Sequence, residues 1–181
     1  MTLLVLLCWL IDGIFAHKFT HMSDKLPIDK SRYSDSKPNY FLSMLGLRCP
    51  RCRRGPMFKN KLNIGVTKNM AMHQQCPVCG QYNELEVGFY YGTGYVSYAL
   101  TVAMTVATFV AYYVLIGISI NDNSLFIWLG VNIAILVIMM PYLMKLSRTI
   151  WLYFFVKYDK DWKTKEAEKP ERIVEEQMGN W

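Results

Sequence analysis

Residues 95–120 read YVSYALTVAMTVATFVAYYVLIGISI, a run of 26 residues without a charged side chain. As an α-helix this run would be about 39 Å long, whereas the hydrocarbon core of a bilayer is about 30 Å thick. A second uncharged run, LFIWLGVNIAILVIMMPYLM, follows at residues 125–144. Two such runs in a chain of 181 residues leave too little polar sequence to enclose them in a soluble fold. The sequence therefore predicts two transmembrane helices.

The composition supports a division into apolar and basic regions. The chain is 52% hydrophobic and 19% charged, with a net charge of +6, and its charged residues lie almost entirely outside the two runs. Five cysteines are too few for a disulfide scaffold of this length. The high aromatic content excludes a wholly disordered chain.

The four residues 121–124 join the two runs, so we expect an antiparallel helix hairpin with both flanks on one side of the membrane. The turn contains no Lys or Arg, whereas residues 48–68 contain seven and residues 145–163 contain five. Positively charged flanks tend to stay in the cytoplasm. The expected orientation therefore has the cysteine-containing head and the C-terminus in the cytoplasm.

Small residues recur every four positions in the first run, at Ala99, Ala103, Ala107 and Ala111. This spacing lets another helix approach closely; alternatively, the alanines only fill the span. In the second run, Asn132 is expected to hydrogen-bond to the first helix. Neither run contains an acidic, basic or histidine side chain, so the residues that carry protons or ions in many transporters are missing from both.

Two CxxC motifs precede the first run: Cys49-Pro50-Arg51-Cys52, and Cys76-Pro77-Val78-Cys79 followed by Gly80. Two residues between cysteines let one tight turn aim both sulfur atoms at a single ion, and glycine after the second turn allows a positive φ. The 23 residues between the inner cysteines slightly exceed the usual spacing of a zinc ribbon. We predict one structural zinc ion per chain, bound by Cys49, Cys52, Cys76 and Cys79.

Other uses of these cysteines remain open at this point. A pair of redox dithiols would need a surrounding βαβ unit, for which the head is too short. A disulfide is disfavoured by the expected cytoplasmic location. His73 is an alternative ligand, although a surface histidine is the simpler interpretation, and Cys8 has no partner.

The head is small, so bound metal must supply much of its folding free energy. Leu62, Ile64 and Val66 alternate with polar or small residues, which predicts one strand of a ribbon hairpin. Glu84 and Glu86 are either a functional acidic pair or solvated charges.

Basic and aromatic side chains cluster near the expected membrane surface. Four arginines surround the first CxxC motif, where they would offset the charge of a four-thiolate zinc site and contact anionic lipids. The segment TIWLYFFV at 149–156 is too short to span a bilayer, so we predict an interfacial helix or a docking segment for a partner. The predicted interfacial residues are Arg51, Arg53, Arg54, Trp151 and Tyr158.

The expected fold is a mainly α-helical membrane protein with six segments. They are an apolar extension at 1–21 (signal-like, an anchor, or upstream of a true start at Met22), a flexible polar tail at 22–44, a zinc-ribbon-like head at 45–94, a transmembrane hairpin at 95–144, an interfacial aromatic segment at 145–162 with a C-terminal helix, and a charged tail at 163–181.

The sequences LRCPRCRRGPMF at 47–58 and CPVCG at 76–80, followed by a glycine-aromatic passage and two apolar helices, resemble a known family. Over residues 45–162 the chain is similar to the small bacterial membrane proteins called domain of unknown function 983. It departs from them at Arg53 and Arg54, which follow the first motif. The resemblance implies a multi-pass protein of the bacterial inner membrane. In some bacteria the family is encoded near genes for terminal oxidases and haem biogenesis, which implies an accessory role in a respiratory complex.

Three functions therefore compete. The first is a non-enzymatic accessory or assembly protein, in which a zinc ribbon and a helix hairpin dock onto a larger membrane complex such as a respiratory oxidase. The second is a metal or thiol-redox carrier for oxidase assembly, and the weakest is a membrane-tethered regulator that binds nucleic acid. The sequence shows neither a nucleophile paired with a base nor a metal site with an open coordination position. We therefore do not expect an enzyme.

Overall fold

The computed structural model describes residues 33, 36–60, 62, 66–117 and 123–170. The described elements, in chain order, are helix α2 (Tyr40–Leu45), helix α3 (Val66–Asn69), the 3₁₀ helix η2 (Phe89–Gly92), helix α4 (Thr93–Leu115) and helix α5 (Ser124–Phe155). The apolar extension at 1–21 with Cys8, most of the polar tail at 22–44 and residues 171–181 lie outside the described residues.

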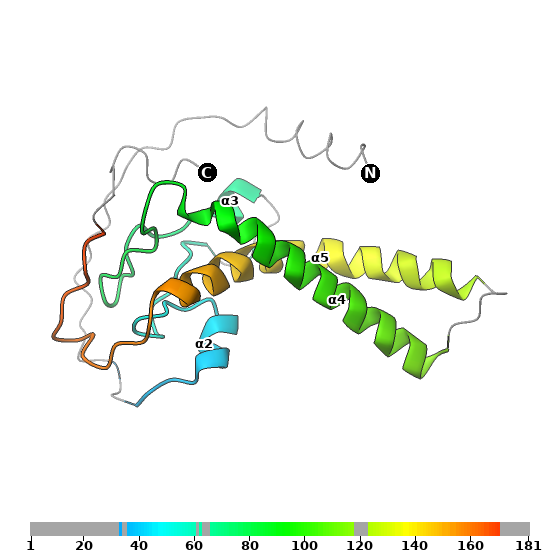
Figure 1. Ribbon diagram of the computed structural model, residues 1–181, viewed down its shortest axis with the longest axis horizontal. Helices are drawn as coiled ribbons and strands as arrows, with labels where there is room; N and C mark the ends of the chain where they lie inside the picture. Colours follow the sequence, from blue (N-terminus) through cyan, green and yellow to red (C-terminus); the bar gives the residue numbers. More distant parts are fainter. Residues whose placement is uncertain (1–32, 34–35, 61, 63–65, 118–122, 171–181) are drawn as a thin grey trace.

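Helices α4 and α5 form a long arm that extends to one side of a compact head (Figure 1). They run antiparallel, because Trp151 of α5 lies beside Gly92 at the start of α4, and Asn132 lies beside Thr108 near the other end. Helix α4 ends where Gly117, at φ +82°, donates its amide to the carbonyls of Tyr112 and Tyr113. The structure thus has the predicted antiparallel arrangement, although residues 118–122 of the turn are outside the described part.

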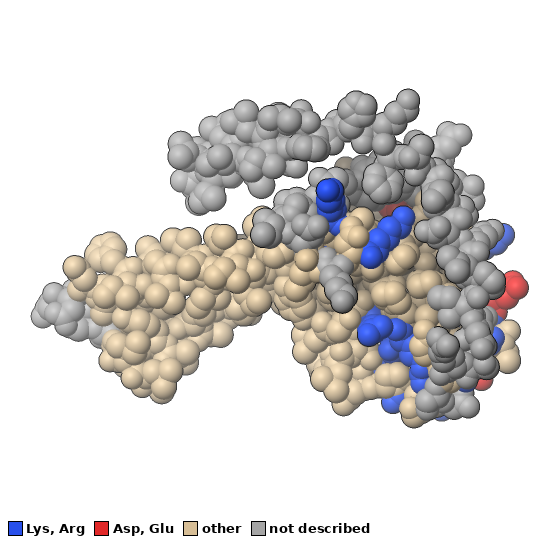
Figure 2. Space-filling model, turned by 180° about the vertical axis from the view of Figure 1, so that it is seen from behind, with Lys and Arg blue, Asp and Glu red and all other residues tan. Residues whose placement is uncertain are grey.

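The arm exposes apolar side chains along nearly its whole length. Helix α4 has no buried residue, and the exposed side chains include Val102, Val110 and Val114 on α4 and Ile133 and Ile138 on α5. Figure 2 shows the Lys and Arg side chains gathered on the head, while the arm shows none on this face. Both helices are long and apolar enough to span a membrane.

Helix α5 differs from the prediction at its C-terminal half. The sequence predicted a span that ends at Met144 and a separate interfacial helix, but α5 continues without a break to Phe155. Beyond Met144 the polar side chains of Lys145, Ser147 and Thr149 are buried against the head. The change from apolar to polar side chains therefore marks a change of surroundings, from the exposed arm to the head, rather than the end of the helix.

The head contains no strand among its described residues. It has only isolated antiparallel bridges, which pair Arg48 with Pro56, Phe58 with Met72, and Gln75 with Tyr82. The strand predicted through Val66 is wrong at that residue, which begins the helix α3; Ile64 is not among the described residues. The backbone of the head forms turns around the cysteines instead. The alternation of apolar with polar or small residues at 62–66 was too short to indicate a strand.

Two small cores hold the head together. The first consists of the four cysteines of the CxxC motifs with Val78 and Trp162. The second lies where the head meets α5 and includes Met57, Phe58, Phe89, Tyr90 and Leu152. The short segment 47–58 contributes to both, because Cys49 and Cys52 belong to the first core and Met57 and Phe58 to the second.

Candidate metal centre

The four cysteines of the CxxC motifs meet in one buried cluster. Their sulfur atoms all lie within 4.8 Å of one another. The Sγ atoms are 3.7 Å apart for Cys49 and Cys79 and 3.8 Å apart for Cys52 and Cys76. A tetrahedral zinc site with Zn–S bonds of about 2.3 Å has sulfur atoms about 3.8 Å apart, whereas a disulfide joins sulfur atoms about 2.05 Å apart. The cluster therefore fits a single metal ion and contains no disulfide.

The two cysteine turns have the same backbone geometry. In the first, the amide of Arg53 donates to the carbonyl of Cys49 at 2.7 Å; in the second, the amide of Gly80 donates to the carbonyl of Cys76 at 2.9 Å. Both donors have positive φ, +56° for Arg53 and +75° for Gly80. The positive φ expected at Gly80 is confirmed. Nothing in the sequence indicated that Arg53 adopts the same conformation, because residues other than glycine rarely do.

Gly55 brings the first turn against the second. Its amide donates to Sγ of Cys52 at 3.4 Å, and its carbonyl accepts from the amide of Cys49 at 2.9 Å. A Cβ atom at this position would overlap Sγ of Cys76 and crowd Val78. Glycine is therefore required here for the four sulfur atoms to converge.

The thiols cannot all ionise together without a cation. Hydrogen bonds with Cys49, Cys76 and Cys79, together with the Gly55 amide, hold the pKa of the Cys52 thiol well below its usual range. Hydrogen bonding to Cys52 and its other neighbours, together with burial, raises the pKa of Cys49. A divalent cation would remove this conflict, since a metal ion binds the thiolate form and displaces the protons.

Arg51 lies inside the head, which differs from its predicted position at the lipid surface. It is 5% exposed, and its guanidinium donates to Oδ2 of Asp159 at 3.1 Å and to the carbonyls of Lys165 and Glu166 at 2.8 and 3.1 Å. A further bond of 3.4 Å reaches the carbonyl of Cys79. Arg51 belongs to the first cysteine turn and donates hydrogen bonds to the second turn and to the chain after α5. It therefore fixes that chain over the cluster.

Trp162 is the residue of the site that the sequence did not reveal. It is 2% exposed and packs with the four cysteines, while the ring of Tyr33 meets it edge-on with centroids 6.3 Å apart. The sequence placed it at the end of the interfacial aromatic segment 145–162, among charged neighbours, and not beside the cysteines. A single tryptophan in the segment DWKTK was the only available signal.

Two other predicted interfacial arginines pack on aromatic rings of the head. The guanidinium carbon of Arg53 lies 5.1 Å from the ring centroid of Tyr40 and 4.7 Å from that of Tyr158. The guanidinium carbon of Arg54 lies 5.6 Å from the ring centroid of Trp162. Arg53, Arg54 and Tyr158 therefore form part of the surface beside the cysteine cluster.

Trp151 joins the head to the arm. Its Nε1 donates to the carbonyl of Phe89 at 2.8 Å, and its ring covers Gly92 so closely that a Cβ atom there would overlap the ring. Nearer the N-terminus of α5, Lys145 Nζ donates to the carbonyl of Asn60 at 2.8 Å, and Asn69 Nδ2 donates to the carbonyl of Pro141 at 2.8 Å. These contacts attach the chain between the two CxxC motifs, and the chain after the second motif, to helix α5.

The predicted helix-packing residues divide into two groups. Asn132 is buried between the helices, where its Oδ1 accepts a hydrogen bond of 2.8 Å from the hydroxyl of Thr108. The side of α4 that carries Ala99, Ala103, Ala107 and Ala111 is exposed instead. Thr108 therefore contacts α5, and the alanine side of α4 does not form the buried face between the helices.

The remaining candidates lie outside the cluster. Glu84 is buried and lies within electrostatic reach of Arg148 and Tyr90, whereas Glu86 is exposed, so the two carboxylates do not share one environment. His73 is half-buried and is not a member of the group that could hold the ion.

Comparison with known proteins finds no matching family model, no matching curated protein and no matching solved structure.

Proposed function

We propose that this chain is a non-enzymatic accessory or assembly protein of a membrane complex, in which a four-cysteine zinc site stabilises a head carried on a transmembrane helix hairpin. The observation that carries the proposal is the closed cysteine cluster at the base of α5. All four cysteines are buried, and Trp162 packs directly against them. Four thiolates complete a tetrahedron around zinc, which leaves no position for a substrate.

Membrane insertion is supported by the exposed arm and by its aromatic residues. Tyr95 and Tyr98 lie near the head end of α4, and Tyr112 and Tyr113 lie near its other end. Tyr95 and Tyr113 are about 27 Å apart along a helix, close to the thickness of a hydrocarbon core. Tyrosines tend to lie at both surfaces of a bilayer. We propose that the hairpin spans the bacterial inner membrane between these two levels.

The basic head supports a cytoplasmic orientation. The described part of the arm between Thr93 and Met144 has no Lys or Arg, whereas the arginines around Cys49 and Cys52 belong to the head. Under the positive-inside rule, the head and the segment after α5 would lie in the cytoplasm.

The rigid junction between head and hairpin suits a protein that positions one partner relative to another. The bonds from Trp151, Lys145 and Asn69 fix the cysteine cluster with respect to the helix axes. The alanine side of α4 is exposed, so it remains available for a helix of a partner. The resemblance to domain of unknown function 983 favours a respiratory complex as that partner.

The test is purification of the full chain in a mild detergent, followed by elemental analysis and native mass spectrometry. We expect one zinc ion per chain, resistant to mild chelators, and co-purification of at least one larger membrane protein. Migration of the zinc-loaded protein strictly alone would contradict the accessory role. Variable copper content, or thiols that react rapidly with alkylating reagents, would favour the metal or redox carrier instead. Salt-dependent binding of RNA or DNA by the purified chain would favour the nucleic-acid regulator.

A further inference from the structure

A basic hollow lies between the start of α2 and the first cysteine turn. Its volume is about 570 Å³, and the residues that line it include Arg48, Arg53 and Arg54. An adjoining hollow of about 550 Å³ adds Lys37. No acidic residue is found among the described residues that line either hollow. Four positive charges around one concave surface favour a negatively charged ligand.

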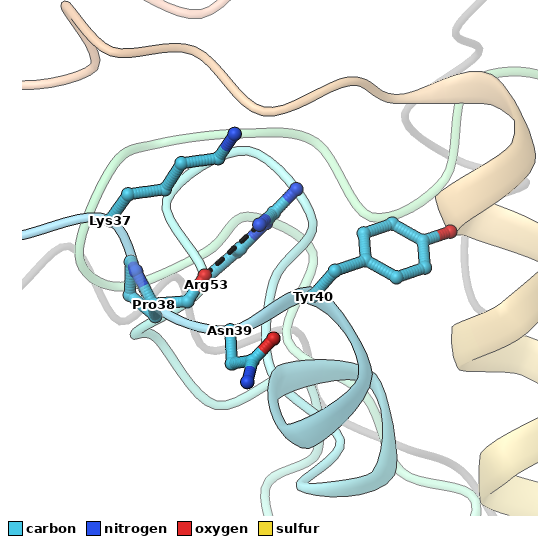
Figure 3. Close-up of a pocket in the computed structure, with 5 residues that line it drawn as sticks. All are labelled: Lys37, Pro38, Asn39, Tyr40 and Arg53. Carbon is cyan, nitrogen blue, oxygen red and sulfur yellow. Dashed lines mark hydrogen bonds between the residues drawn. The ribbon is translucent and has the colours of Figure 1, made fainter.

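Hydrogen bonds hold Arg48 and Arg53 in place and leave some of their N–H groups without a hydrogen-bond acceptor in the described part of the chain. Arg53 Nη1 donates to the carbonyl of Pro38 at 3.0 Å, and its Nε is buried without a hydrogen-bond partner in the described part of the chain. Figure 3 shows this hydrogen bond from Arg53 to the carbonyl of Pro38, the residue that follows Lys37. Arg48 Nη1 donates to the carbonyl of Arg54 at 2.8 Å. Since a guanidinium has five N–H groups, Arg48 and Arg53 retain donors that suit a phosphate.

An exposed apolar face adjoins this hollow. Phe41, Leu42 and Leu45 of α2 are 67%, 69% and 48% exposed, and Leu42 also lines the hollow. The carbonyl of Leu45 accepts a hydrogen bond of 2.9 Å from the hydroxyl of Tyr142. Tyr142 lies within one turn of Lys145, the first charged residue of α5. The C-terminal end of α2 is therefore level with the end of the apolar part of α5.

We propose that the hollow and the exposed face of α2 bind one anionic phospholipid. Arg48, Arg53 and Lys37 contact the phosphate, and the acyl chains lie along Phe41, Leu42 and Leu45. A nucleic acid would use the positive charges but would leave three large apolar side chains in water, whereas a lipid uses both surfaces. The inference rests on the proposed membrane insertion, because it places α2 at the surface of the bilayer that α4 and α5 cross.

The test is native mass spectrometry of the full-length protein in detergent, titrated with phosphatidylglycerol or phosphatidylcholine. We expect clear preference for phosphatidylglycerol. The double variant Lys37→Gln/Arg48→Gln should bind it roughly 25-fold more weakly, since each charge near a lipid surface contributes about a factor of five. The control Lys157→Gln/Lys160→Gln removes two exposed charges of the head outside the hollow and should change the affinity less than twofold.

A second variant, Phe41→Ser/Leu42→Ser, tests the apolar part. It should also weaken binding of phosphatidylglycerol, while glycerol phosphate in excess should not displace the lipid from the unsubstituted protein. Displacement by glycerol phosphate would overturn the lipid assignment in favour of a small-anion site, and displacement by RNA would do so in favour of nucleic acid. Equal binding of the two lipids, or an equal loss in the control variant, would also overturn it. Zinc content and membrane extraction are measured on every variant, so a failure of the underlying membrane proposal is recognised separately.

Discussion

Gly55 lies against Sγ of Cys76 so closely that a Cβ atom on Gly55 would overlap the sulfur. This contact joins the two cysteine turns, which are separated in the sequence but contribute to one cluster of four sulfur atoms. It also distinguishes the roles of the two glycines that follow the motifs, because Gly80 has open space around its missing Cβ.

The substitution Gly55→Ala should abolish stable metal binding. The added methyl group must displace Cys76 or Val78, and overpacking of this kind costs about 1–3 kcal/mol even without a bound ion. We expect less than one zinc per chain by elemental analysis and a lower thermal unfolding midpoint. A fully zinc-loaded Gly55→Ala protein would show that the turns do not meet as described.

The matched substitution Gly80→Ala should retain the metal. Its methyl group meets no atom within 4 Å, and only the φ of +75° is unfavourable. The expected cost is about 1 kcal/mol, seen as a small fall in the unfolding midpoint at full zinc occupancy. If Gly80→Ala lost zinc as readily as Gly55→Ala, the steric argument would fail.

The substitution Gly92→Ala should loosen the junction between head and hairpin. A Cβ atom there would overlap the ring of Trp151, so the ring and its hydrogen bond to Phe89 would have to move. We expect destabilisation of about 1–3 kcal/mol and a change in tryptophan fluorescence, with zinc retained. The control Gly94→Ala adds a methyl group into open space and should leave both properties nearly unchanged.

The substitution Asp159→Asn should open the cover of the metal centre. Asp159 accepts hydrogen bonds from Nε and Nη2 of Arg51, and loss of its charge weakens the attachment of the segment that carries Trp162. We expect zinc to be lost to a chelator roughly tenfold faster, as for loss of hydrogen bonds to a charged group. Asp161→Asn is the control, because the side chain of Asp161 is exposed and should not affect the rate.

Zinc affinity should fall steeply as the pH is lowered. Hydrogen bonds with the other three cysteines, together with burial, raise the pKa of Cys49. The hydrogen bond with Cys49 lowers the pKa of Cys79, but hydrogen bonds with Cys52 and Cys76 and burial outweigh it, so the net pKa of Cys79 is also raised and both groups bind protons when the metal leaves. Metal binding releases those protons, and acid therefore favours the metal-free protein. Competition with a chromogenic chelator at several pH values should show at least two protons exchanged per zinc. A pH-independent affinity would contradict binding by thiolates.

Acid should weaken the cover of the cluster as well. Burial raises the pKa of the Asp159 carboxyl, but hydrogen bonds from the amide of Asp161 and from the Arg51 guanidinium lower it by a larger amount. The net pKa is therefore below the usual range. A group with a lowered pKa in the folded state stabilises the fold above its ordinary pKa, and this contribution is lost as the pH falls through the lowered value. The Asp159→Asn protein should therefore lack this part of the acid sensitivity.

Local patterns predicted the features that depend on nearby residues. The CxxC spacing predicted the cysteine cluster and the positive φ of Gly80, and two uncharged runs predicted the two long helices. In each case the sequence constrains the geometry directly, through the reach of two side chains on one turn or the length of an apolar helix.

The features that the sequence did not predict all depend on distant contacts. Trp162 is buried because the chain after α5 returns to the cysteines, where Arg51 binds it. Helix α5 continues through Lys145 with that side chain buried, because its ammonium group donates a hydrogen bond to the carbonyl of Asn60. Arg53 adopts a positive φ while its guanidinium packs between Tyr40 and Tyr158. No periodicity or spacing in one segment encodes these partners.

The most direct test of the account is the metal content of the full-length protein purified from membranes in a mild detergent. We predict one zinc ion per chain, retained against a mild chelator and lost when Cys52 and Cys76 are replaced by serine. Protein that is folded and extracted from membranes without zinc, or that readily exchanges zinc for copper, would contradict a structural metal centre in a membrane-anchored head.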